Sequence, residues 1–162
     1  MDYQCPSCRL AAKMLDNYCK EYPSKLYLQV RFHPLKQHPH GLESALYAEC
    51  ATRQNKFWVF HRLLFENQSE WEKNPDTAGT FHGYAQQAGM DLKKLDACLE
   101  NPLTKETVLQ EDMDSVALGV HSTPTFFING KMIVGPKLLL EELIARSSDF
   151  KFDLQKEEKN AH

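Results

Sequence analysis

The chain has 162 residues with 19 basic and 22 acidic side chains, a net charge of −3, and 42% hydrophobic residues. This length and composition predict one folded domain with room for an inserted subdomain, and they exclude a disordered chain. The charge is close to neutral and shows no basic cluster, which argues against nucleic-acid binding. No run approaches the roughly 18 to 20 apolar residues that span a bilayer, so we expect no stable membrane insertion. The first residues also lack the basic and then apolar pattern of an export signal.

An amphipathic helix is predicted near the start of the chain. Apolar residues recur every three or four positions from Cys8 to Tyr22, which places them on one face of a helix. Pro23 should end this helix, whereas Pro6 suits its first turn, where a missing N–H has no cost. The helix is therefore expected to begin within residues 5–8.

A half-buried strand is predicted from Leu26 to Phe32, because apolar and polar residues alternate there. Between Gly41 and Gly119 the pattern is almost entirely helical. Gly119 stands where a glycine just beyond a helix end would relieve the left-handed turn. We therefore expect a block of helices that begins soon after the strand.

The pattern becomes β-rich after this helical block. Residues 124–128 form a predicted strand, Asn129-Gly130 is the strongest short hairpin signal, and Lys131–Val134 supply the returning strand. A closing helix is predicted from Pro136 to Arg146, and the polar tail after it is expected to fray.

This order predicts a small α/β unit that is interrupted by helices. The core of the unit is expected to comprise residues 1–35 and 119–147. Residues 36–118 would then form the inserted helical domain, and residues 148–162 the polar tail.

The most informative motif is Cys5-Pro6-Ser7-Cys8 at the start of the first predicted helix. A thiolate there faces unpaired N–H groups and the positive end of the helix dipole, which can lower a thiol pKa from about 8.5 to roughly 3.5–7.5. Cys5 is thus the candidate nucleophile. Cys8 lies one turn further along the apolar stripe, where burial keeps it protonated until a mixed disulfide forms at Cys5. Cys8 is thus the candidate resolving thiol.

Two other interpretations of this motif remain open. The pair could be half of a zinc site that His33, His38, His40 or another cysteine completes. It could also be a purely structural crosslink. A zinc site of this kind normally brings a second closely spaced cysteine pair, which the chain lacks. We therefore predict no metal ligands.

Four segments together resemble the DsbA-like thiol-disulfide oxidoreductases of the thioredoxin superfamily. In chain order these are Asp2-Tyr3-Gln4-Cys5-Pro6-Ser7-Cys8, then Phe32-His33-Pro34-Leu35 with His38-Pro39, then Ala48-Glu49-Cys50-Ala51 with Lys56-Phe57-Trp58, and finally residues 119–130 around Thr123-Pro124-Thr125-Phe126. The resemblance extends from residue 2 to about residue 146. It implies an α/β fold in which a thioredoxin-like core carries an inserted helical domain.

The resemblance also implies a function. Cys5 and Cys8 would exchange a disulfide with protein or peptide thiols and be recycled by a redox partner, without a metal or organic cofactor. Pro6, Ser7 and Thr123 would influence the redox potential. The Thr123–Pro124 peptide bond would be cis and face the motif, leaving the Thr123 backbone free to pair with a substrate segment. A reductase or isomerase with the same site, and a catalytically impaired binding module, remain as alternatives.

The other three cysteines are assigned separately. Cys19 is expected to be a buried apolar residue, the usual situation of a free cysteine. Related proteins often carry cysteines in the contexts of Cys50 and Cys98. The resemblance therefore implies a structural disulfide between them, with Cα atoms closer than about 7 Å.

One departure from the family concerns the central strand, which precedes the Asp-Tyr-Gln-Cys segment in related proteins. Only four residues precede Cys5, so this N-terminal central strand, expected between Leu26–Phe32 and Thr125–Ile128, is missing. An upstream segment could be absent, a partner chain could supply a strand in a strand-sharing dimer, or residues 149–154 could take the place. We favour the first. A periplasmic or exported location is favoured by the resemblance, because the same missing segment could carry the signal.

Overall fold

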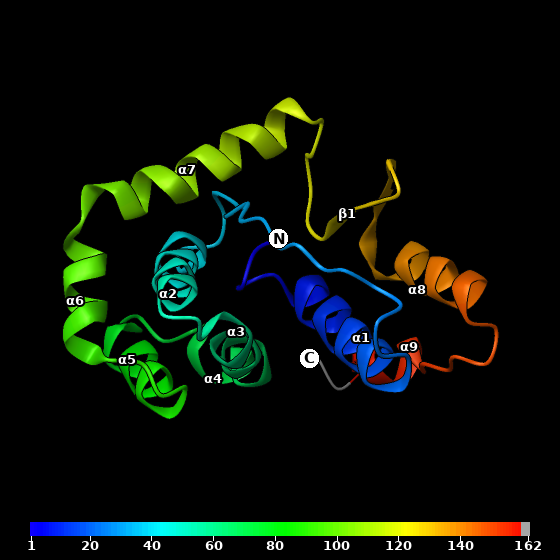
Figure 1. Ribbon diagram of the computed structural model, residues 1–162, viewed down its shortest axis with the longest axis horizontal. Coiled ribbons are helices and arrows are strands. Elements are labelled where there is room, and N and C mark those ends of the chain that lie inside the picture. The colour runs from blue at the N-terminus through cyan, green and yellow to red at the C-terminus, as the bar shows by residue number, and fades with distance from the viewer. Residues whose placement is uncertain (160–162) are drawn as a thin grey trace.

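The computed structural model describes residues 1–159, and the helices and strands fall into two groups on either side of the N-terminus (Figure 1). The elements are α1 (Pro6–Glu21), α2 (Gly41–Arg53), α3 (Phe57–Glu66), α4 (Gln68–Trp71), α5 (Ala78–Gln87), α6 (Leu92–Glu100), α7 (Pro102–Ala117), β1 (Thr125–Ile128), β2 (Lys131–Val134), α8 (Gly135–Arg146) and α9 (Leu154–Lys159). Helices α2 to α6 lie on one side, whereas β1, β2 and α8 lie on the other (Figure 1).

Helix α1 lies between these two groups. Each group has its own hydrophobic core, and α1 contributes side chains to both. It begins at Pro6, as the fixed φ of proline favours, and it ends at Glu21, with Tyr22 as the C-cap residue just before Pro23. Cys8 packs in the core of the helical group, whereas Met14 and Tyr18 are fully buried in the core formed with α8. The apolar stripe predicted from the sequence therefore packs against the helical group at its start and against α8 further along the helix.

The helical group is built around α2, which packs against α3, α5, α6 and α7. Large apolar side chains fill its centre. Four of them are completely shielded from solvent: Phe60, Trp71, Phe81 and Leu95. Helices α6 and α7 start where Asp91 and Asn101 accept hydrogen bonds from first-turn amides, which is the usual role of Asp and Asn as N-caps.

The predicted hairpin is confirmed. Strands β1 and β2 are antiparallel, with Thr125 opposite Val134 and Ile128 opposite Lys131. Asn129 and Gly130 have φ of 51° and 84°, the left-handed conformations that a two-residue turn of this kind requires. The turn therefore fixes the register that places Ile133 in the core with α8.

The prediction of a strand from Leu26 to Phe32 is wrong, because these residues form no strand. The segment is extended, and its exposure alternates as expected, with Tyr27 94% exposed. Its backbone has few strand-like bonds: Met1 N donates to the Arg31 carbonyl at 2.7 Å and His33 N donates to the Met1 carbonyl at 2.8 Å. A strand is stabilised by a paired neighbour, and the sheet among residues 1–159 contains only β1 and β2.

The expectation of a fraying tail is also wrong within the described residues. Phe150 is buried, and its ring centroid lies 5.0 Å from that of Tyr18. Lys13 Nζ and Glu157 Oε2 are 2.6 Å apart, which ties α9 to α1. Residues 149–154 therefore pack on α1 and form no strand. Residues 160–162 lie outside the described part of the chain, and the domain boundaries and the strand-sharing dimer stay predictions.

Candidate functional site

The Cys5-Pro6-Ser7-Cys8 motif forms the first turn of α1. Cys5 is the N-cap residue, and its carbonyl accepts hydrogen bonds from Cys8 N at 3.0 Å and Arg9 N at 3.2 Å. Both cysteines are free thiols and both are largely buried, with exposed fractions of 6% for Cys5 and 3% for Cys8. The structure thus holds the motif in its dithiol form.

The two thiols have opposite electrostatic environments. The pKa of Cys5 is lowered to about 6, mainly by a hydrogen bond from the Cys8 thiol and further by Thr123 and by the backbone N–H groups of Cys8 and Ser7, against the effect of burial. The pKa of Cys8 is raised well above its ordinary value, mainly by burial and also by Cys5. At neutral pH the expected species is a Cys5 thiolate beside a protonated Cys8, so one thiol is the nucleophile and its neighbour is held in reserve.

Thr123 comes from the loop between α7 and β1 and lies beside Cys5. The Thr123–Pro124 peptide bond is cis, and the Thr123 carbonyl oxygen lies 3.5 Å from Cys5 Sγ. The Thr123 hydroxyl oxygen is buried without a hydrogen-bond partner among residues 1–159, and its side chain lowers the pKa of Cys5. This loop therefore brings a free polar group to the nucleophile from far along the chain.

A buried polar scaffold holds the segment that leads into Cys5. The side chain of Gln68 is completely buried, and its Nε2 donates to the carbonyls of Tyr3 at 2.6 Å and Cys5 at 3.1 Å. The Tyr3 hydroxyl lies 3.0 Å from Nδ1 of His61. Tyr3 belongs to the first segment of the family resemblance, whereas the roles of Gln68 and His61 could not be predicted, because their spacing from the motif carries no periodic signal.

The histidines considered as zinc ligands do not converge on the motif. His33 Nδ1 lies 2.6 Å from Asp112, His38 Nδ1 lies 2.9 Å from Asp2, and His40 Nδ1 lies 3.7 Å from Glu43. Within the described chain, no group of three or more His, Cys, Asp or Glu side chains is arranged to hold a metal ion.

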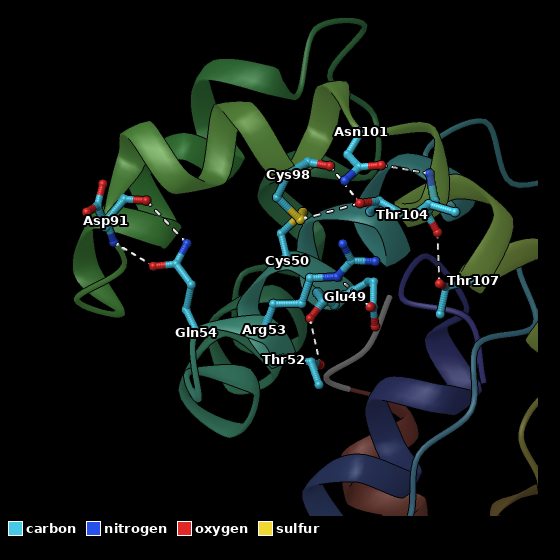
Figure 2. The surroundings of a disulfide bond; sticks show 12 residues. Glu49, Cys50, Thr52, Arg53, Gln54, Asp91, Cys98, Asn101, Thr104 and Thr107 are labelled. Atoms are coloured by element: carbon cyan, nitrogen blue, oxygen red, sulfur yellow. Dashed lines mark hydrogen bonds and ion pairs between the residues drawn. A yellow bond between two sulfur atoms is a disulfide. The ribbon is translucent and has the colours of Figure 1, made fainter.

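Cys50 and Cys98 form a disulfide that joins α2 to α6, with their Cα atoms 5.9 Å apart, so the expected pairing is confirmed. Figure 2 shows two further polar links around it: Thr104 Oγ1 donates to the Cys98 carbonyl at 2.6 Å, and Gln54 exchanges two hydrogen bonds with the backbone of Asp91. Cys19 is only half-buried, contrary to expectation, although the adjacent Tyr18 is completely buried.

The sequence of the chain is similar to those of known proteins over most of its length. Residues 1–143 match a protein-family model described as thioredoxin. The chain belongs to the thioredoxin family. Two curated relatives are the Na(+)/H(+) antiporter NhaA of Herminiimonas arsenicoxydans, 32% identical over 135 residues, and NhaA 1 of Mycobacterium sp. (strain KMS), 31% identical over 138 residues. The matches cover 83% of this chain but only 21% and 22% of those proteins, so the chain spans about a fifth of their length.

Solved structures share the fold of this thioredoxin-family chain. The thiol-disulfide exchange protein α-DsbA2 of Wolbachia pipientis superposes with a TM-score of 0.74 at 17% identity, covering 91% of this chain and 78% of that one. A thioredoxin-like oxidoreductase from Silicibacter pomeroyi DSS-3 gives 0.70 at 22% identity, covering 93% and 84%. The fold is therefore the α/β, DsbA-like form of the thioredoxin superfamily. In residues 1–159, none of the helices has both the length and the apolar character needed to cross a membrane.

Proposed function

We propose that the chain is a protein thiol-disulfide oxidoreductase that exchanges a Cys5–Cys8 disulfide with cysteines of protein or peptide substrates. The observation that carries this proposal is the opposite shift of two adjacent thiols: the pKa of Cys5 is lowered to about 6 while that of Cys8 is raised. A purely structural crosslink has no need of this asymmetry, whereas exchange requires one stable thiolate and one thiol in reserve.

The reaction in the oxidising direction has two exchanges. A substrate thiolate attacks Cys5 Sγ of the disulfide, forming a mixed disulfide with Cys5 and releasing the Cys8 thiolate, which takes up a proton. A second substrate thiolate then attacks the substrate sulfur of the mixed disulfide. This step forms the substrate disulfide and releases the Cys5 thiolate, so two electrons pass from the substrate to the cysteine pair. The lowered pKa of Cys5 makes it a good leaving group in the second exchange.

The Thr123–Pro124 loop is the proposed contact for the substrate backbone. Pro124 has no N–H, and the Thr123 carbonyl, which accepts from the Cys5 thiol at 3.5 Å in the dithiol form, would pair instead with an extended segment that runs alongside Cys5. The Thr123 hydroxyl, which has no other partner in the described structure, would donate to the Cys5 thiolate. Pro6 and Ser7 present the backbone of the first turn, of which the Ser7 N–H contributes to lowering the pKa of Cys5.

An assay of both reaction directions tests the proposal. The oxidised protein should promote refolding of a reduced substrate protein, and the reduced protein should cleave the disulfides of insulin. Cys5→Ala should abolish both activities, and Cys8→Ala should accumulate a mixed disulfide between Cys5 and the substrate that reductant releases. Cys19→Ala is the matched control and should behave as the wild type. Activity that survives Cys5→Ala would rule out this mechanism, and a redox titration against glutathione measures which direction is favoured.

A further inference from the structure

Asp2 is a buried carboxylate whose bonds converge on the segment before the cysteine pair. Its side chain has no solvent exposure. Oδ1 accepts a hydrogen bond from Gln4 N at 2.7 Å, and Oδ2 accepts one from Leu35 N at 2.6 Å and lies 2.9 Å from His38 Nδ1. A buried carboxylate is stable only when such donors replace water. These bonds therefore fix the orientation of the Asp2 side chain.

The backbone of the same residue contacts both cysteines. Asp2 N donates to Cys8 Sγ at 3.5 Å, and the Asp2 carbonyl accepts from Cys5 N at 3.3 Å. The N–H of Asp2 acts to lower the pKa of Cys8, against the larger raising effects of burial and of Cys5, while the amino group of Met1 also lowers it. Asp2 is thus a residue whose main chain touches the resolving thiol and whose side chain holds that main chain in place.

The surroundings leave little freedom for the carboxylate to move. A Cβ atom built on Gly41 would lie 2.9 Å from Asp2 Oδ2, closer than real Cβ contacts allow. Gly41 begins helix α2, and the preceding amide, His40 N, donates to the Gln4 side chain at 2.7 Å. The segment before Cys5 is therefore hydrogen-bonded to the start of α2 through Gln4, and the close approach of the Asp2 carboxylate leaves no room for a side chain at position 41.

We propose that Asp2 is a positioning residue for the resolving thiol: its carboxylate orients the Asp2 N–H toward Cys8 Sγ, so that this N–H stabilises the Cys8 thiolate as it attacks a mixed disulfide on Cys5. The inference rests on the proposed exchange at Cys5 and Cys8. In the step concerned, the Cys8 thiolate forms a bond to Cys5 Sγ, the bond between Cys5 and the foreign sulfur breaks, and the foreign thiolate leaves. The proton that Cys8 loses beforehand goes to solvent.

One experiment measures the attack by Cys8 separately from the attack by Cys5. The reduced protein, carrying Cys19→Ser, is mixed with a symmetric aromatic disulfide that releases one coloured thiolate at each exchange. Cys5 attacks first and releases one thiolate, and Cys8 then closes the protein disulfide and releases the second. For Asp2→Asn we expect the second phase to slow by about tenfold or more, as for loss of an oriented hydrogen bond to a charged group. Its pH profile should move to higher pH, while the first phase stays within about threefold of the wild type.

Two further variants provide a second test of the Asp2 carboxylate and a control. Gly41→Ala leaves the carboxylate present but displaces it, and it should slow the second phase in the same direction, even if Asp2→Asn fails to fold. Asp16→Asn, which removes a partly exposed carboxylate paired with Lys20, is the matched control and should leave both phases unchanged.

The outcomes separate this inference from the proposed function. A wild-type protein that releases only one coloured thiolate would overturn the proposed function, because the pair could not close. Two normal releases in the wild type, with an unaltered second phase in folded Asp2→Asn and Gly41→Ala, would overturn the role of Asp2 alone. Equal slowing of both phases would also overturn it, because it would indicate a general structural effect.

Discussion

The Tyr3 hydroxyl and Nδ1 of His61 lie 3.0 Å apart, both buried, and join the segment before the cysteine pair to helix α3. Burial lowers the pKa of His61 from its ordinary value of 6.5 to about 4, with the neighbouring Arg62 adding to the effect. His61 is therefore neutral in the folded protein above about pH 4.

This pKa predicts a pH dependence of stability. Between pH 6.5 and about 4 the unfolded chain binds a proton at His61 that the folded chain does not. The free energy of unfolding should therefore be fully maintained above pH 6.5 and fall as the pH drops through this window, by up to about 3 kcal/mol. Urea unfolding at a series of pH values measures it. In His61→Gln this component should disappear, whereas the exposed His121→Gln should retain it.

The thiol environment predicts how Cys5 reacts. In a Cys19→Ser background, the rate of alkylation of Cys5 should rise with pH through an inflection near pH 6, its lowered pKa. Cys8→Ala should move the inflection to higher pH, because the hydrogen bond from the Cys8 thiol is the largest cause of the shift. Mass spectrometry of the alkylated protein follows the reaction. An inflection that stays at its wild-type position in Cys8→Ala would contradict the assigned cause.

The disulfide between Cys50 and Cys98 should stabilise the helical group without taking part in exchange. Its cysteines are 48 residues apart in the sequence, so replacing both with alanine should lower the free energy of unfolding by about 4 kcal/mol. Chemical denaturation measures the loss. The rates of both exchanges at Cys5 and Cys8 should be the same as in the wild type at temperatures where the variant is folded, and a slowed exchange there would show that the disulfide is coupled to the site.

Gln68 is predicted to be a stabilising residue of the site. Gln68→Leu would keep much of the buried volume but leave the Tyr3 carbonyl without its Gln68 donor and remove one of the three donors to the Cys5 carbonyl. We expect a loss of about 1–3 kcal/mol in the free energy of unfolding, the cost of one buried carbonyl that loses its hydrogen-bond donor. Gln86→Leu on the exposed face of α5 is the matched control and should change stability by less than about 0.5 kcal/mol. Equal unfolding midpoints for the two variants would contradict the prediction.

The elements that could be predicted from the sequence are those whose conformation is set by residues within the same short segment. Asn129 and Gly130 adopt positive φ readily, so the hairpin follows from the turn itself. Pro6 and Pro23 mark the limits of α1 for equally local reasons. The cysteine pair could be identified in the same way, because its chemistry depends on the adjacent start of a helix.

The features that escaped prediction depend on distant parts of the chain. Tyr27 and its neighbours have strand-like alternation, but a strand also needs a paired neighbour, which a local pattern cannot supply. Phe150 lies in a polar segment and is buried because Tyr18 and Tyr22 offer an aromatic surface. Asp2 and Gln68 look like ordinary surface residues in the sequence, and only the fold reveals that their partners, Leu35 and Tyr3, lie in distant segments of the chain.

Helix α1 belongs to two hydrophobic cores at once, with Cys8 in one and Met14 and Tyr18 in the other. Neither core can open without exposing one face of the same helix, so the two groups of elements should unfold as a single cooperative unit. Amide hydrogens in the middle of α1 should accordingly exchange only through global unfolding. The cysteine motif at the N-terminal end of this helix is buried as well, so the reactive thiols belong to the part of the fold that should open last.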